Sequence, residues 1–86
     1  MNSTYGQALR VIVKFRNAVP YRDEAFLQDI GQKIHAPIIF ISSVAPDTHV
    51  YRIEPQTGQS HADILQRLAG LPYVLRVEAD TVARPS

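Results

Sequence analysis

The sequence predicts an α+β fold, a ferredoxin-like plait with the element order β-α-β-β-α-β. Three observations support this prediction: four segments of strand character, two segments with apolar residues at helical spacing, and turn residues between them. A right-handed crossover in each βαβ half places both helices on one face of a four-stranded antiparallel sheet. The other face of the sheet is then open to solvent or to a partner.

The first predicted strand is LRVIVKFR, residues 9–16, in which side chains alternate between two faces. This period of two predicts a strand with one buried face, because successive side chains of a strand point to opposite sides of the sheet. The expected buried set is Leu9, Val11, Val13 and Phe15, and the expected outward set is Arg10, Ile12, Lys14 and Arg16.

The first predicted helix is YRDEAFLQDIGQKIH, residues 21–35, with apolar residues at helical spacing: Phe26, Leu27, Ile30 and Ile34. Acidic residues fall in its first turn and basic residues in its last, as the helix dipole favours. Gly31 weakens the helix interior, so we expect another part of the chain to pack closely there.

A hairpin and a second helix follow. The segments PIIFISSV (37–44) and THVYRIE (48–54) are predicted strands, and the residues APD between them favour a turn. The second predicted helix is SHADILQRLAGL, residues 60–71, which begins with a capping box of Ser60 and Asp63. Gly70 and Pro72 end this helix.

The last predicted strand is YVLRVEAD, residues 73–80, which alternates again. The alternation puts one set of side chains inward and the other on the open face: Tyr73, Leu75, Val77 and Ala79 inward, and Val74, Arg76, Glu78 and Asp80 outward. Two carboxylates therefore share the open face of the final strand.

Composition indicates one small soluble domain. The 86 residues are 45% hydrophobic and carry a net charge of +1, with no basic run and no cysteine. We expect a flexible arm over residues 1–7, the domain over 8–80 and an extended tail over 81–86. The longest apolar run, APIIFI, is too short to cross a bilayer, and no signal peptide is visible. If Met1 is the native start, the expected location is the cytoplasm.

The sequence contains no motif of an enzyme or of a cofactor site. His35, His49 and His61 share no metal-ligand spacing, and we interpret them as solvated or structural residues. The segment TGQSH fits a helix cap and lacks the pattern of a nucleophile elbow. We interpret the neighbouring carboxylates as solvated surface: Asp23 with Glu24, and Glu78 with Asp80. We therefore expect no catalytic activity, no cofactor and no metal.

The end of the chain resembles a known family. VIVKFR is similar to the first strand of the propeptides of subtilisin-like serine proteases and of the stand-alone inhibitors related to them. The match is sharpest over LQRLAGLPYVLRVEADTVARPS, where Val74, Val77, Glu78 and Asp80 stand at the positions of the family's V-x-x-V-E-x-D strand. A tail of six residues follows Asp80, the length that in such propeptides reaches the cleavage point.

The resemblance implies a protease inhibitor that can also assist folding of the protease. In the family, the open face docks on two parallel surface helices of the protease, and carboxylates at the positions of Glu78 and Asp80 cap their N-termini. The tail enters the active-site cleft, with Ser86 in the primary specificity pocket and Ala83 three residues upstream. The protease-binding residues expected in the tail are Thr81, Val82, Ala83, Arg84, Pro85 and Ser86. Ser86 departs from the large last residue of well-known subtilisin propeptides.

Other interpretations fit the same residues. Glu78 can pair with Arg76 or Lys14 at the surface. The protein can be a non-enzymatic binding or regulatory module without a protease partner, such as a homodimer formed through open sheet faces. A nucleic-acid-binding plait is disfavoured, because its open face should carry aromatic residues. Its cationic candidates are Arg10, Lys14, Arg16, Arg52 and Arg76.

Overall fold

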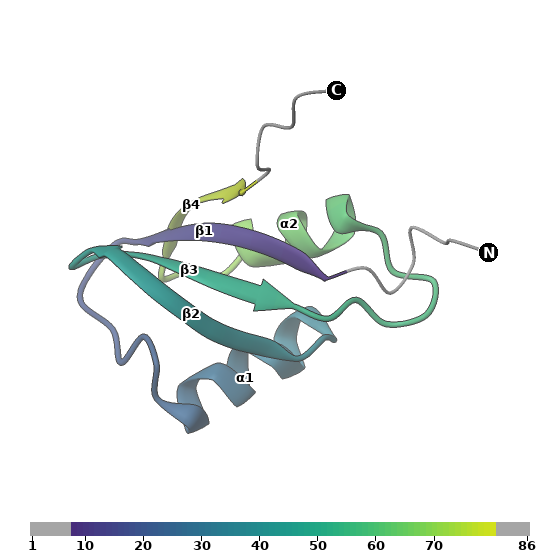
Figure 1. Ribbon diagram of the computed structural model, residues 1–86, viewed down its shortest axis with the longest axis horizontal. Coiled ribbons are helices and arrows are strands. Elements are labelled where there is room, and N and C mark those ends of the chain that lie inside the picture. Colours follow the sequence, from purple (N-terminus) through teal and green to yellow (C-terminus); the bar gives the residue numbers. More distant parts are fainter. Residues whose placement is uncertain (1–7, 81–86) are drawn as a thin grey trace.

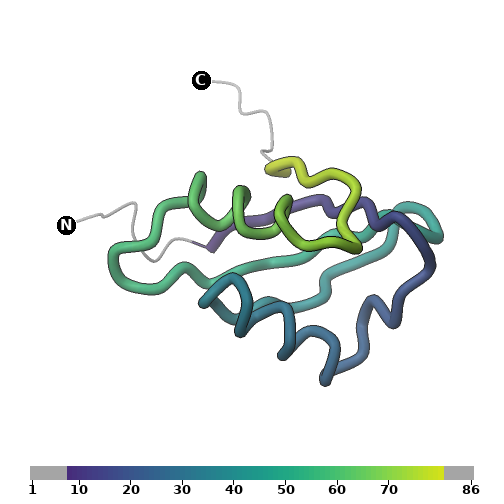
Figure 2. The backbone as a smooth tube through the Cα atoms, turned by 180° about the vertical axis from the view of Figure 1, so that it is seen from behind, coloured from purple at the N-terminus to yellow at the C-terminus, as the bar shows by residue number. Residues whose placement is uncertain are grey.

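The computed structural model describes residues 8–80 of the chain, and within them it has the predicted element order. The elements are β1 (Leu9–Phe15), α1 (Glu24–Ile34), β2 (Ile38–Ala45), β3 (Thr48–Ile53), α2 (His61–Ala69) and β4 (Val74–Ala79). The strands form one antiparallel sheet in the order β2-β3-β1-β4 (Figure 1). Both helices cover the same face of this sheet, the face turned toward the reader in Figure 2. The predicted plait is therefore confirmed, whereas the predicted arm (1–7) and tail (81–86) lie outside the described residues.

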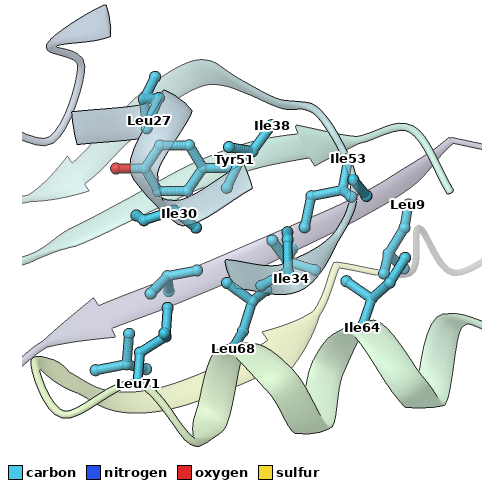
Figure 3. Packing of buried hydrophobic residues seen from close by; sticks show 14 of the residues in the cluster. Leu9, Leu27, Ile30, Ile34, Ile38, Tyr51, Ile53, Ile64, Leu68 and Leu71 are labelled. Atoms are coloured by element: carbon cyan, nitrogen blue, oxygen red, sulfur yellow. The ribbon is translucent and has the colours of Figure 1, made fainter. Parts of the chain in front are cut away.

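The core lies between the helices and one face of the sheet. In β1 the predicted buried set is confirmed, since the side chains of Leu9, Val11, Val13 and Phe15 are at most 5% exposed. Figure 3 shows Ile34 of α1 and Leu68 of α2 over the sheet. Burying the apolar faces of both helices against the strands is the main source of stability in a fold of this kind.

The predicted facing is wrong at the start of β4. The alternation placed Val74 outward and Leu75 inward, but Val74 is 2% exposed and Leu75 is 50% exposed. The pairing register shifts between Lys14 and Phe15, so that Phe15 lies opposite Val74 and Leu75 is an extra residue. A bulge of this kind interrupts the period of two and turns the following side chains to the other face. Beyond the bulge, Val77 lies opposite Val13 on the core face.

The predicted cap of α2 is confirmed, whereas α1 begins three residues later than the predicted range, so that Asp23 is its N-cap and does not lie in its first turn. The Asp23 carboxylate accepts a hydrogen bond from the Phe26 N–H, and the Ser60 hydroxyl oxygen accepts one from the Asp63 N–H. Each such bond satisfies one of the unpaired N–H groups of a helix N-terminus.

The C-terminus of α1 explains Gly31. The N–H groups of His35 and Ala36 both donate to the Gly31 carbonyl, which folds the chain back over the last turn. A Cβ on Gly31 would lie 3.1 Å from the Ala36 carbonyl oxygen, so the expected close approach is present. His35 occupies the left-handed position of this turn, with φ of 62° and ψ of 34°.

Replacing His35 with glycine is expected to stabilise the fold. A left-handed conformation costs an ordinary residue about 1 kcal/mol, and glycine adopts it without a Cβ clash. We expect His35→Gly to raise the free energy of unfolding by about 0.5–1 kcal/mol in urea denaturation. The matched control is Gln32→Gly in the exposed helix interior, which should lower it by about 1 kcal/mol. A loss of stability in both variants would contradict this reading of the turn.

Candidate functional site

The open face of the sheet is built from three rows of side chains that run across the strands. The first, the arginine row, contains Ile39, Arg52, Arg10 and Asp80. The second, the apolar row, contains Ser42 with the neighbouring Ile41 of β2, Val50 of β3, Ile12 of β1 and Glu78 of β4. The third, the lysine row, contains Ala45, Thr48, Lys14 and Arg76. This register follows from β1, whose inward residues fix which residues point outward.

Glu78 and Asp80 both lie on this face, as the alternation predicted. Glu78 lies opposite Ile12, and its carboxylate is 3.6 Å from the Arg76 guanidinium. The Asp80 carboxylate is held more closely, with Oδ2 2.8 Å from Nε of Arg10. The Asp80 N–H also donates to the Arg10 carbonyl, which fixes the backbone at the end of β4.

The two carboxylates differ in what they can offer a partner. The Glu78 side chain is 60% exposed, and its contact with Arg76 is long, so both oxygens are accessible to a new donor. Asp80 is 29% exposed, and its Oδ2 is already engaged by Arg10. A carboxylate has about four acceptor positions, so Oδ1 of Asp80 can accept from an additional N–H. The predicted pairing of Glu78 with Arg76 is thus present and leaves both carboxylates able to accept hydrogen bonds.

A shallow hollow lies beside Glu78. It has a volume of about 120 Å³ and is lined by Ile12, Lys14, Thr48, Arg76 and Glu78. Its lining therefore combines the Ile12 side chain and the Glu78 carboxylate of the apolar row with cationic and hydroxyl groups of the lysine row. Sequence reasoning did not find this hollow, because it depends on the cross-strand register of β3, β1 and β4.

A second depression lies away from the open face, beside α1 and the start of β2. It has a volume of about 410 Å³, and its lining is mostly apolar with several amide side chains: Leu27, Gln28, Gly31, Gln32, His35, Ala36, Pro37, Ile38 and Gln56. The sequence indicates this depression only through Gly31, where it predicts the close approach of another part of the chain. No carboxylate lines it, so it lacks an acid–base pair.

The three histidines lie apart, as predicted. His35 caps α1, and His61 begins α2. His49 is 1% exposed on the core face of β3, where its ring stacks on Tyr21 with centroids 3.9 Å apart. Within residues 8–80 no cluster of three or more histidine, aspartate and glutamate side chains could hold a metal ion.

His49 is held by one polar contact inside an aromatic cluster. Its Nδ1 is 2.7 Å from the Ser43 hydroxyl oxygen, whereas Nε2 is buried without a hydrogen-bond partner among the described residues. Burial lowers the pKa of His49, and the Pro46 carbonyl and the Asp47 carboxylate offset only part of this effect. The ring is therefore favoured in its neutral form in the folded protein.

The aromatic side chains of the described strands face the core. Phe15 and Tyr51 are buried, and Phe40 lies opposite Tyr51 on the same side of the sheet. The Tyr51 hydroxyl donates to the Tyr21 carbonyl at 2.6 Å, and burial raises the pKa of Tyr51. Among residues 8–80, the open face thus presents no aromatic ring for base stacking, although it carries four cations: Arg10, Lys14, Arg52 and Arg76.

Comparison with known proteins finds no matching family model, no matching curated protein and no matching solved structure. In the part of the chain that the structure describes, neither helix is long and apolar enough to cross a membrane. The residues of the open face are therefore the basis on which a function is inferred.

Stability should fall in acid because of His49. Its folded-state pKa lies below the ordinary value of 6.5, so the unfolded chain binds the extra proton as the pH drops. We expect the free energy of unfolding to decrease as the pH falls below about 6.5, with a contribution from this residue of at most about 1.4 kcal/mol per pH unit. Urea denaturation from pH 8 to 5 measures this slope.

The matched variant is His49→Phe, which keeps an aromatic ring and removes the titrating group. Its slope below pH 6.5 should be shallower than that of the wild type, and the two slopes should agree between pH 7 and 8. Equal slopes at low pH would show that His49 is not the group responsible.

Proposed function

We propose that the protein binds a subtilisin-like serine protease through the open face of its sheet and blocks the protease cleft with residues 81–86. The observation that supports this most directly is the position of Glu78 and Asp80. Both carboxylates lie on the uncovered face at its β4 edge, at the two places that the family resemblance assigns to helix capping. The protein acts as a binding partner and carries out no chemistry of its own.

The proposed contact follows from ordinary electrostatics. A helix N-terminus has unpaired N–H groups and a partial positive charge, so a carboxylate placed there accepts hydrogen bonds and complements the dipole. Glu78 and Asp80 are two residues apart and can meet two helix ends that lie side by side. The apolar row next to them supplies surface that is desolvated on docking, as the centre of a stable interface requires.

The tail extends the same interface. Asp80 is the last described residue and lies on the rim of the open face, so the residues after it begin at the edge of the proposed contact. Six extended residues reach about 20 Å, which is sufficient to enter a neighbouring cleft. There an extended peptide pairs with an edge strand of the enzyme through backbone hydrogen bonds. Binding only the native protease also favours its folding.

Removing the two carboxylates is expected to weaken inhibition. The double variant Glu78→Gln and Asp80→Asn keeps the shape of both side chains and should cost about 1–3 kcal/mol of binding free energy across the two helix ends. The measurement is the inhibition constant against a panel of subtilisin-like proteases. Glu54→Gln is the matched control, because it removes a carboxylate that is paired with Arg52 of β3 and lies outside β4. Equal losses in both variants would contradict the capping role.

Deleting residues 81–86 separates docking from blocking. Because all four strands and both helices described lie within residues 9–79, we expect the circular dichroism spectrum and the melting temperature of the truncated chain to change little. Inhibition should fall by at least about tenfold, since the backbone pairing in the cleft is lost. Undiminished inhibition by the truncated chain would rule out the blocking role of the tail.

A second function is favoured by the exposed apolar residues of β2. Ile39 and Ile41 are 49% and 40% exposed at the edge of the open face, which suits a protein contact of any origin. A binding or regulatory module without a protease partner, such as a homodimer through two open faces, would use the same residues. It differs from the first function in leaving every protease of the panel uninhibited.

A further inference from the structure

The lysine row carries a pair of like charges that the described carboxylates compensate only in part. Lys14 of β1 lies directly opposite Arg76 of β4, and cations at directly opposed positions repel each other. Among the described residues no carboxylate forms an ion pair with Lys14, and the Arg76 guanidinium has only the long 3.6 Å contact with Glu78. The Asp47 carboxylate accepts from the Thr48 hydroxyl instead.

The arginine row shows how the same situation is resolved elsewhere on this face. Arg10 and Arg52 also lie directly opposite each other. Each has its own carboxylate, at 2.8 Å from Asp80 for Arg10 and at 3.0 Å from Glu54 for Arg52. The Arg10–Arg52 pair is therefore neutralised within the fold, whereas the Lys14–Arg76 pair has one long contact with a single carboxylate.

The Lys14–Arg76 pair also borders a recess. Lys14 and Arg76 both line the hollow of about 120 Å³, whose apolar side is Ile12. A group that enters this hollow meets two cations and one carboxylate, Glu78, so the lining has a net positive charge. The group also loses part of its contact with water, which strengthens each charge interaction. A carboxylate is small enough for this volume and can accept from both cations at once.

We propose that this hollow is an anion subsite, which takes the carboxylate of an acidic side chain on a protein docked against the open face. The subsite rests on the proposed function only in using the open face as the docking surface. It adds a chemical requirement for the partner: an aspartate or glutamate must lie beside an apolar patch that covers Ile12 and Ile41. Glu78 also lines the hollow and contacts Arg76, so we expect the incoming acid to lie nearest Lys14.

The surroundings of the hollow favour a protein carboxylate over the phosphates of a nucleic acid. The adjacent row presents the apolar side chains of Ile12 and the exposed Ile41. Within residues 8–80 the same face has no aromatic ring on which bases could stack. A protein surface that presents one acid within an apolar patch complements both features.

The test is a titration of the full ¹⁵N-labelled chain by nuclear magnetic resonance. The probe is a blocked six-residue peptide of alternating valine and glutamate, and its control is the same peptide with glutamine in place of glutamate. We expect the glutamate peptide to shift the amides of Lys14, Thr48 and Arg76 and to bind several-fold more tightly than the glutamine peptide. A hexanucleotide of single-stranded DNA at the same ionic strength should bind more weakly than the glutamate peptide.

Two matched variants locate the charge. Lys14→Met keeps the apolar stem of the side chain and should weaken binding of the glutamate peptide by about fivefold. Arg52→Met removes the same charge from the neutralised row and should change binding by less than about twofold. Because Lys14 faces a like charge, Lys14→Met should melt no lower than the wild type.

Several results would overturn the subsite. These are equal affinity for the glutamate and glutamine peptides, shifts centred on Arg10 and Arg52, tighter binding of the oligonucleotide, or a lower melting temperature for Lys14→Met. The titration uses no protease, so it also separates the two proposals. Peptide binding with no protease inhibited would contradict the proposed function alone, and inhibition without selective peptide binding would contradict the subsite alone.

Discussion

The pairing register of β1 is the constraint on which the rest of the structure depends. β1 lies inside the sheet, and Val13 is opposite both His49 of β3 and Val77 of β4. A slip of one residue would turn every side chain of a strand to the other face, exposing the apolar set and burying Arg10 and Lys14. Burying those charges without partners would cost more free energy than the other interactions of a small domain can offset. The composition of β1 therefore fixes its register, and this register sets the three rows of the open face.

The sequence was sufficient to predict the fold, because apolar residues recur at regular spacing in the strands and helices that bury only one face. β1 alternates strictly, and each helix carries an apolar stripe with a capping residue before it, Asp23 or Ser60. The start of β4 was predicted wrongly because a bulge depends on how two strands meet and leaves no local mark in the sequence. The extra residue, Leu75, is apolar like its neighbours, so nothing in its type indicated that it points outward.

The candidate site was predictable only in part, for a related reason. The shared face of Glu78 and Asp80 follows from a spacing of two within one strand. By contrast, three features of the site depend on pairing between strands that are distant in sequence. These are the ion pair of Arg10 with Asp80, the opposed cations Lys14 and Arg76, and the hollow that these two cations line. The tail residues 81–86 lie outside the described part of the chain, so their proposed role rests on the family resemblance and on the position of Asp80.

The edges of the sheet help to decide how a partner can dock. Both edge strands are irregular: β2 shifts register near Ile41 and again near Val44, and β4 carries the bulge at Leu75. Irregular edges hinder the addition of a further strand, which needs an unbroken row of backbone N–H and C=O groups. A strand added along β2 would therefore not readily cover the exposed Ile39 and Ile41. A partner that lies on the open face can contact both side chains. A partner that lays a flat or helical surface on the open face meets the apolar row and the charges on either side of it together, so docking on the face is the mode of association that this sheet favours.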